Sequence, residues 1–141
     1  MRKTFAPNPK NIEKKWHFID ASDRILGQLA SEVAILLMGK HKAEFSPNQE
    51  LGDKVVITNA EKIAVTGKKL TDKVYQHYTG YPGGLRTETL GHLMERRPTE
   101  ALRRAIKGML PKNKLLDKRL MNLYIYAGSE HPHKGQEVKK I

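Results

Sequence analysis

Three aspartates are the carboxylates of this sequence whose positions best suit metal-assisted chemistry. Asp20 and Asp53 flank predicted strands, a place that suits carboxylates holding a catalytic metal ion, and Asp23 follows closely. One hypothesis is therefore a metal-dependent nuclease that uses these three residues. The simpler interpretation of Asp20 and Asp23 is structural, because an aspartate before a helix accepts hydrogen bonds from its first free backbone N–H groups.

Other chemistry has little support in the sequence. His131-Pro132-His133 offers two metal ligands, but two ligands without a cysteine make a weak site. There is no cysteine, no His-Glu-x-x-His pattern, no glycine-rich dinucleotide or P-loop motif, and no serine in a nucleophile elbow. We therefore expect no catalytic residue, no metal, no cofactor and no small-molecule substrate, so the chain is not predicted to be an enzyme.

The composition indicates a polyanionic partner. The 141 residues include 26 Lys and Arg against 15 Asp and Glu, a net charge of +11. Such a surplus favours binding to a nucleic acid. No apolar run approaches the roughly 20 residues of a membrane span, and the basic N-terminus has no apolar run behind it. These features predict a soluble intracellular protein without a membrane partner.

The positive charge is concentrated in one stretch. Residues 96–119 hold nine Arg and Lys, opposed only by Glu100 and Asp117. Within the helix predicted after Pro98, the apolar residues recur on one side at the helical period, while Arg103, Arg104 and Lys107 lie on the other. A solvated helix face would also be charged, but it normally mixes both signs, so the pattern favours polyanion binding.

Three shorter segments are ambiguous. Lys40-His41-Lys42 follows a predicted helix C-terminus, where cations interact favourably with the helix dipole even without a ligand. Lys68 and Lys69 lie in a predicted turn. Gly83 and Gly84 beside Tyr78 and Tyr81 form either an ordinary reverse turn or a site where the backbone approaches a phosphate and the rings stack on a base or sugar.

The elements that must position these residues alternate between strand and helix patterns. Ser22 and Asp23 are predicted N-caps of the first helix, and Gly39 its left-handed C-terminal cap. The predicted strands are Lys15–Asp20, Lys54–Thr58, Ile63–Thr66, Lys73–Tyr78 and Leu123–Tyr126. The predicted helices are Arg24–Met38, Thr87–Arg96, Pro98–Leu110 and Leu115–Leu120.

This order predicts one α/β layered domain over residues 14–127. Residues 1–13 are expected to form a basic N-terminal arm, and residues 128–141 a polar C-terminal tail. The long connections between strands favour parallel pairing with right-handed crossovers.

Six segments in order resemble the family of large-subunit ribosomal protein thirteen, of bacterial type. They lie within the stretch from about Lys14 to His133, and they are Gly39–Ala43, Ala64–Gly67, Thr71–Tyr75, Thr79–Gly84, Ile106–Pro111 and Tyr126–His131. The resemblance implies a three-layer α/β/α sandwich with a four-stranded, mainly parallel sheet. It also implies a structural role in the cytoplasmic large ribosomal subunit, without enzymatic activity, and binding to large-subunit rRNA early in assembly, beside neighbouring ribosomal proteins.

The resemblance and the charge pattern together predict the residues that contact RNA. They are Lys40, His41, Lys42, Lys68, Lys69, Tyr78, Tyr81, Gly83, Gly84, Arg96, Arg97, Arg103, Arg104, Lys107, Lys112, Lys114 and Arg119. Contacts of this kind are made mostly with phosphate and ribose, while RNA shape selects the site. A third hypothesis, an adaptor for acidic partners that reads charge alone, predicts equal binding to any RNA or to heparin.

Overall fold

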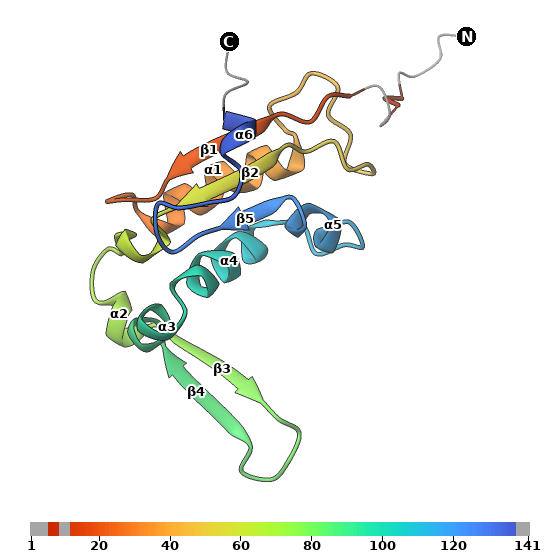
Figure 1. The fold of residues 1–141 in the computed structure, drawn as a ribbon. Helices are drawn as coiled ribbons and strands as arrows, with labels where there is room; N and C mark the ends of the chain where they lie inside the picture. Colours follow the sequence, from red (N-terminus) through yellow and green to blue (C-terminus); the bar gives the residue numbers. More distant parts are fainter. Residues whose placement is uncertain (1–5, 9–11, 138–141) are drawn as a thin grey trace.

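A central parallel sheet organises the molecule, which is described by a computed structural model over residues 6–8 and 12–137 (Figure 1). Strands β1 (Trp16–Asp20), β2 (Lys54–Thr58) and β5 (Leu123–Ile125) pair in the order β1-β2-β5. Both pairings are parallel, as the long connections predict. The parts of the predicted arm and tail at residues 1–5, 9–11 and 138–141 lie outside the described residues.

Helix α1 (Leu26–Met38) packs its apolar stripe against one face of this sheet. Leu29, Val33 and Leu37 on the helix are fully buried, as are Val55 and Ile57 on the central strand. The near-continuous apolar run of β2 is what a central strand covered on both faces requires. These apolar side chains form the core of the domain.

The start of α1 differs from the prediction. The N-cap residue is Ile25, with no side-chain cap, and Asp23 has a left-handed backbone with φ 57°. The carboxylate of Asp20 instead accepts hydrogen bonds from the backbone N–H and the hydroxyl of Ser22, both within the preceding turn. Ser22 and Asp23 were therefore wrongly predicted as helix caps, since the chain makes one further turn before the helix begins.

The sheet has three strands rather than the four expected. Residues Ile63–Thr66 form only a single parallel bridge, between Ala64 and Ile25, and do not join the sheet. A 3-10 helix at Ala60–Lys62, which follows a left-handed Asn59, turns the chain away from β2. The backbone of Ala64 instead pairs with the loop before α1, through the hydrogen bonds to the Arg24 carbonyl and from the Leu26 N–H.

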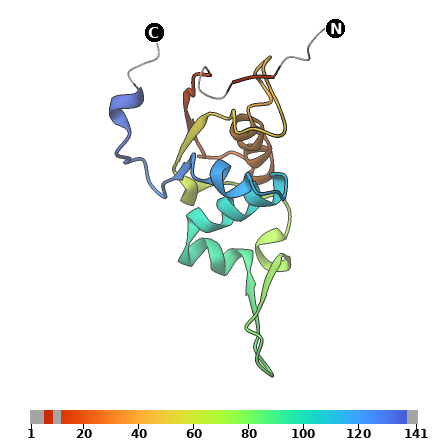
Figure 2. The ribbon, with the colours of Figure 1, turned by 90° about the vertical axis from the view of Figure 1, so that its right-hand side faces the viewer.

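A two-stranded antiparallel hairpin projects from the body of the molecule (Figures 1 and 2). Strand β3 (Val74–Tyr78) pairs with β4 (Leu85–Thr89), and α2 (Lys69–Asp72) precedes the hairpin. Part of the helix predicted over Thr87–Arg96 is therefore strand. The helix, α3, begins only at Leu90, because Thr89 pairs with Val74 and its hydroxyl accepts the N–H of His92.

Helices α4 (Pro98–Met109) and α5 (Leu116–Leu120) follow the predicted bounds closely. Pro98 begins α4, where its missing N–H costs nothing. Helix α4 packs against α1 and α3, so it joins the core to the base of the hairpin. No helix among the described residues has the length and apolar character needed to cross a membrane.

The second face of the sheet carries aromatic rings and is covered by the segment after β5. Trp16 stacks on Tyr124 with ring centroids 5.7 Å apart, and the ring of His133 lies 5.1 Å from Trp16 and 4.6 Å from Tyr124. The single turn α6 (Lys134–Glu137) lies beside β1 (Figure 1). The fold is therefore mixed α/β, with this short segment in place of a full second helical layer.

Candidate nucleic-acid interface

The outer face of α4 presents exposed cations to solvent. Ala101, Leu102 and Ile106 are buried on its inner side, while Arg103 and Lys107 are exposed on the outer side. Neither of these two cations forms an ion pair with any residue that the structure describes. Their charges are therefore available to an anionic partner.

Arg104, also exposed, connects this helix face to the hairpin. Its guanidinium lies 5.1 Å from the ring centroid of Tyr75 on β3, and its Nε donates to Glu100 at 3.0 Å. A cation held over an aromatic face at this distance is attracted by the ring. Arg104 therefore serves to orient the hairpin as well as to add charge to the surface.

A groove of about 480 Å³ opens where the hairpin meets the helices. Its lining includes an aromatic ring and several basic side chains, namely Tyr75, His77, Arg86, Arg96 and Arg104. A phosphate could be held by such cations while a ribose or base lies against the ring. The groove thus has the composition of a surface for RNA backbone.

One acidic residue offsets part of this charge. Glu88 accepts hydrogen bonds from His92 Nδ1 at 2.9 Å and from Arg96 Nη2 at 2.8 Å. The hydrogen bond from His92 lowers the pKa of Glu88, burial opposes this effect, and the charge of Arg96 lowers the pKa further. Arg96 is therefore partly engaged, whereas Arg86 has no ion-pair partner among the described residues.

The tip of the hairpin carries the predicted tyrosines and glycines. The side chains of Tyr78 and Tyr81 are exposed, at 60% and 75%, rather than packed at the base of the turn. Gly83 and Gly84 lie in the turn itself, where the Gly84 N–H donates to the Tyr81 carbonyl at 2.9 Å. The rings are thus free to stack on a partner.

Several other predicted cations lie near α4. Lys69, at the start of α2, lines a hollow together with Arg104, and Lys112 lines another with Arg104 and Lys107. Lys68, Arg97 and Lys114 are also exposed. The structure therefore brings most of the predicted residues to α4 and the segments around it. We call this surface, including the hairpin groove, the α4 face.

The loop after α1, which carries the predicted cations Lys40, His41 and Lys42, lies at the opposite end of the molecule from the hairpin (Figure 1). Lys40 is exposed, but Lys42 points inward: its Nζ lies 2.5 Å from Oδ1 of Asp53 and also donates to the carbonyl of Leu51 at 2.9 Å. Lys42 is thus held inside the protein rather than offered to a partner.

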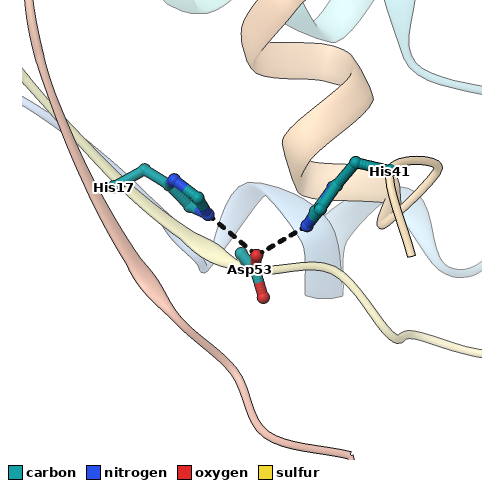
Figure 3. A group of neighbouring side chains, drawn as sticks. All are labelled: His17, His41 and Asp53. Atoms are coloured by element: carbon teal, nitrogen blue, oxygen red, sulfur yellow. Dashed lines mark hydrogen bonds and ion pairs between the residues drawn. The ribbon is translucent and has the colours of Figure 1, made fainter.

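The carboxylate of Asp53 is bound by several polar groups from different parts of the chain. The side chain is fully buried, its Oδ1 accepts the Lys15 N–H at 3.0 Å, and its Oδ2 lies 2.8 Å from His17 Nε2 and 2.9 Å from His41 Nε2 (Figure 3). Burial acts to raise the pKa of Asp53, but the hydrogen bonds from Lys42, His17 and Lys15 outweigh it and hold the pKa below its ordinary value. The carboxylate is therefore ionised at neutral pH.

Two glycines allow the loop to place Asp53 here. Gly39 ends α1 with φ 77°, a left-handed conformation that glycine adopts without strain. Gly52 passes so close to the end of α1 that a Cβ would collide with the Leu37 carbonyl. The Asp53 N–H then donates to the Leu36 carbonyl at 3.1 Å. We call Asp53 and its partners His17, His41 and Lys42 the Asp53 cluster.

Arg119 does not lie where an RNA contact requires it. Its side chain is buried, at 1% exposure, and its Nε and Nη1 have no hydrogen-bond partner among the described residues. Burial lowers the pKa of Arg119, an effect that the charge of Glu50 partly opposes. The short helix α5 turns this residue inward, so we remove it from the predicted RNA-contact set.

The nuclease hypothesis fails on geometry. Asp20 ends β1 and pairs with Thr58 at the end of β2, whereas Asp53 precedes β2. Because the two strands are parallel, the carboxylates lie at opposite ends, roughly 15 Å apart for a strand of this length. Asp20 is instead held by Ser22 and by Asn59, whose hydrogen bond is the main cause of its lowered pKa.

His131 and His133 do not converge on a metal position either. Their rings lie 6.4 Å apart and pack against the aromatic face of the sheet, where His133 Nε2 lies 3.0 Å from Tyr126 Oη. Both side chains are thus part of the packing of the tail.

Some residues of the groove were not predicted. Tyr75, His77 and Arg86 alternate with outward residues along β3 and β4 and so share one face of the hairpin. The signal for this face was the alternation of every second residue before and after the glycine turn, which is typical of a hairpin. The prediction missed it because residues from Thr87 onward were assigned to a helix. The role of Asp53 as the partner of Lys42 had no such local signal.

Known proteins are similar to this chain over nearly its whole length. The family described as Ribosomal protein L13 matches residues 14–132. The large ribosomal subunit protein uL13 of Oleidesulfovibrio alaskensis is 54% identical over 99% of this chain and 96% of its own length. The uL13 protein of Symbiobacterium thermophilum is 53% identical over 100% of this chain and 99% of its own length. The uL13 protein of Trichormus variabilis is 47% identical over 100% of this chain and 93% of its own length. The chain therefore belongs to the ribosomal protein L13 family.

Proposed function

We propose that this protein is a structural constituent of the large ribosomal subunit in the cytoplasm, where it binds large-subunit rRNA through the α4 face and helps to organise it early in assembly. The family is structural and non-enzymatic, which agrees with the prediction that the chain is not an enzyme. The relatives are named as large ribosomal subunit proteins, which supports a location in the ribosome. The same names support neighbouring ribosomal proteins as further partners.

The observation that carries the RNA-binding proposal is the outward direction of the cations on α4. Arg103 and Lys107 are exposed without ion-pair partners in the described chain, and the groove beside them adds Arg86 and the ring of Tyr75. Each cation that neutralises a phosphate releases condensed counterions, so affinity should fall with salt. Arginine can also bind a phosphate with two parallel hydrogen bonds, which lysine cannot.

The two regions of predicted contact then have different roles. The α4 face and the tip of the hairpin, with Tyr78 and Tyr81, bind RNA directly. In the loop after α1, Lys40 offers an exposed positive charge without an ion-pair partner in the described chain, whereas His41 and Lys42 are bound to Asp53. A protein with separated contacts of this kind can hold RNA segments from different helices in one arrangement, which is an architectural role.

The test compares Arg103→Ala/Lys107→Ala with Lys15→Ala/Lys134→Ala, which removes two exposed charges next to β1 and α6, outside the α4 face. Arg104 is left intact because it also supports the hairpin. Binding to deproteinised large-subunit rRNA is titrated at several salt concentrations. We expect the first variant to bind more weakly and its salt slope to fall by about 2, roughly one per lost phosphate contact, while the control changes little. Equal loss in both variants would contradict the placement.

Sedimentation from a lysate tests the structural role separately. We expect the tagged protein to co-migrate with the large subunit and its precursors after a high-salt wash. Release at high salt, together with equal competition by heparin and rRNA, would favour the adaptor that reads charge alone.

A further inference from the structure

Two imidazole nitrogens converge on one carboxylate oxygen in the Asp53 cluster (Figure 3). His17 comes from β1, His41 from the loop after α1, and Asp53 from the residue before β2. Their ligand atoms all lie within 4.8 Å of one another. This is the one group of three such ligands within residues 6–8 and 12–137.

The two distances from the histidine nitrogens to Oδ2 are within about half an ångström of those in a tetrahedral metal site. Zinc binds histidine nitrogen and carboxylate oxygen at about 2.0–2.2 Å, which places neighbouring ligand atoms about 3.3 Å apart. The two nitrogens of the cluster lie 2.8 and 2.9 Å from Oδ2, so each must move about half an ångström away from that oxygen, and the two nitrogens, which lie within 4.8 Å of each other, must settle about 3.3 Å apart. In such a site the metal takes the place of the protons that now lie between these atoms.

The rest of the cluster holds the carboxylate in a suitable state. Lys42 and the Lys15 N–H occupy Oδ1, which leaves Oδ2 for a metal. Lys42 is positively charged and lowers the affinity for a cation, but its Nζ is also held by the carbonyls of Leu51 and Glu13 and so stays on the Oδ1 side. The imidazole side chains of His17 and His41 are 31% and 32% exposed, so an ion can enter between them.

We propose that His17 Nε2, His41 Nε2 and Asp53 Oδ2 form a zinc-binding site with a fourth position open to solvent. Two nitrogen donors and one oxygen donor suit zinc, whereas magnesium and calcium prefer oxygen ligands alone. The bound ion joins β1, the loop after α1 and the start of β2, and so fixes the loop that carries Lys40.

Isothermal titration of the full-length protein with zinc chloride tests the site, with cobalt as a spectroscopic probe. We expect one equivalent of zinc to bind and cobalt to give the intense visible bands of a tetrahedral site. His17→Gln and His41→Gln should each weaken binding by at least about tenfold, since loss of even an outer partner of a metal ligand costs that much. His17→Cys, which supplies a thiolate ligand, should retain it.

His77→Gln and His133→Gln are the matched controls. The first removes an exposed histidine of the hairpin and the second a histidine of the tail. Zinc affinity should be unchanged in both. The proposal is overturned if no stoichiometric zinc binds to the folded wild-type protein, if folded His17→Gln binds as tightly as wild type, or if His133→Gln loses binding. Asp53 is left unchanged because its loss would destabilise the fold.

Discussion

The loop after α1 and the outer face of α4 are both rich in cations, yet they direct these cations in opposite ways. Lys42 points inward to a fully buried carboxylate, Asp53, and His41 lies against the same group. Arg103 and Lys107 point outward and have no ion-pair partner in the described chain. The same residue types therefore stabilise the fold in one region and remain available for binding in the other.

The difference arises from where an acidic residue is buried. Burying a charge is costly unless a partner compensates it, so Asp53 requires the neighbouring cations. The inner side of α4 buries only apolar residues, so nothing draws its cations inward. A count of positive charges along the chain is therefore a poor measure of binding surface until the buried carboxylates are located.

The largest effect should come from Asp53→Asn. The substitution leaves Lys42 without its counter-charge inside the protein, and breaking a buried ion pair typically costs about 3–5 kcal/mol. We expect the free energy of unfolding, measured by urea denaturation, to fall by about this amount. Glu44→Gln, at an exposed acid of the same loop, should change little. A loss below about 1 kcal/mol would mean that the cluster is not a stabilising centre.

Gly52→Ala should have the next largest effect, by disturbing the placement of Asp53. The added methyl group would collide with the backbone of Leu37, and such overpacking costs roughly 1–3 kcal/mol. Gly108→Ala in α4 meets no atom within 4 Å and should instead raise stability by about 0.5–1 kcal/mol, because alanine favours helix. Thermal unfolding of the two variants should therefore shift in opposite directions, and the same shift in both would contradict the comparison.

Acid should weaken the Asp53 cluster in a predictable direction. Because the folded-state pKa of Asp53 lies below its ordinary value of 3.8, the unfolded chain takes up the proton first as pH falls. The contribution of Asp53 to stability is complete above that value and is lost as pH falls toward the folded-state pKa. Stability measured from pH 6 to pH 2.5 should fall less steeply in Asp53→Asn; identical slopes would show that other carboxylates dominate.

A smaller effect on stability is expected at Arg104, an exposed cation of the α4 face that also contacts the hairpin. Arg104 lies over Tyr75, and an exposed cation–aromatic pair is worth about 0.5–1 kcal/mol. A double-mutant cycle with Arg104→Ala and Tyr75→Leu should give a coupling energy of this size. Coupling near zero would mean that Arg104 serves only the surface.

The smallest effect on stability should come from Arg103→Ala/Lys107→Ala. Exposed substitutions away from caps and packed contacts usually change the free energy of unfolding by less than about 0.5 kcal/mol. Lys42→Met, which removes one cation from the other region, should cost more than this pair does. If the double variant unfolds more easily than Lys42→Met, the distinction between the two regions is wrong.

Local patterns predicted those parts of the fold that depend on local physics. The apolar runs of β1, β2 and β5, the period of α1 and α4, and the left-handed cap at Gly39 were all confirmed. The failures needed information from distant parts of the chain. Ile63–Thr66 has strand-forming residues, but the 3-10 helix before it carries the segment away from the sheet edge.

The same division holds for the candidate interface. The helical period was sufficient to predict that Arg103 and Lys107 share one face, and the structure places both in solvent. The inward direction of Lys42 could not be predicted, because it depends on Asp53 lying against the end of α1. Arg119 failed for a related reason, since α5 is too short for its periodicity to show which side is buried.

The parallel sheet also constrains how the chain folds. Trp16 pairs with Lys54, but Val55 on the same central strand pairs with Leu123, near the other end of the chain. Contacts between residues so far apart in sequence form slowly, because the loop between them must first be closed. During synthesis, one edge of β2 stays without its partner until β5 has emerged, whereas the hairpin of β3 and β4 needs only local residues. The hairpin can therefore form before the parallel sheet is complete.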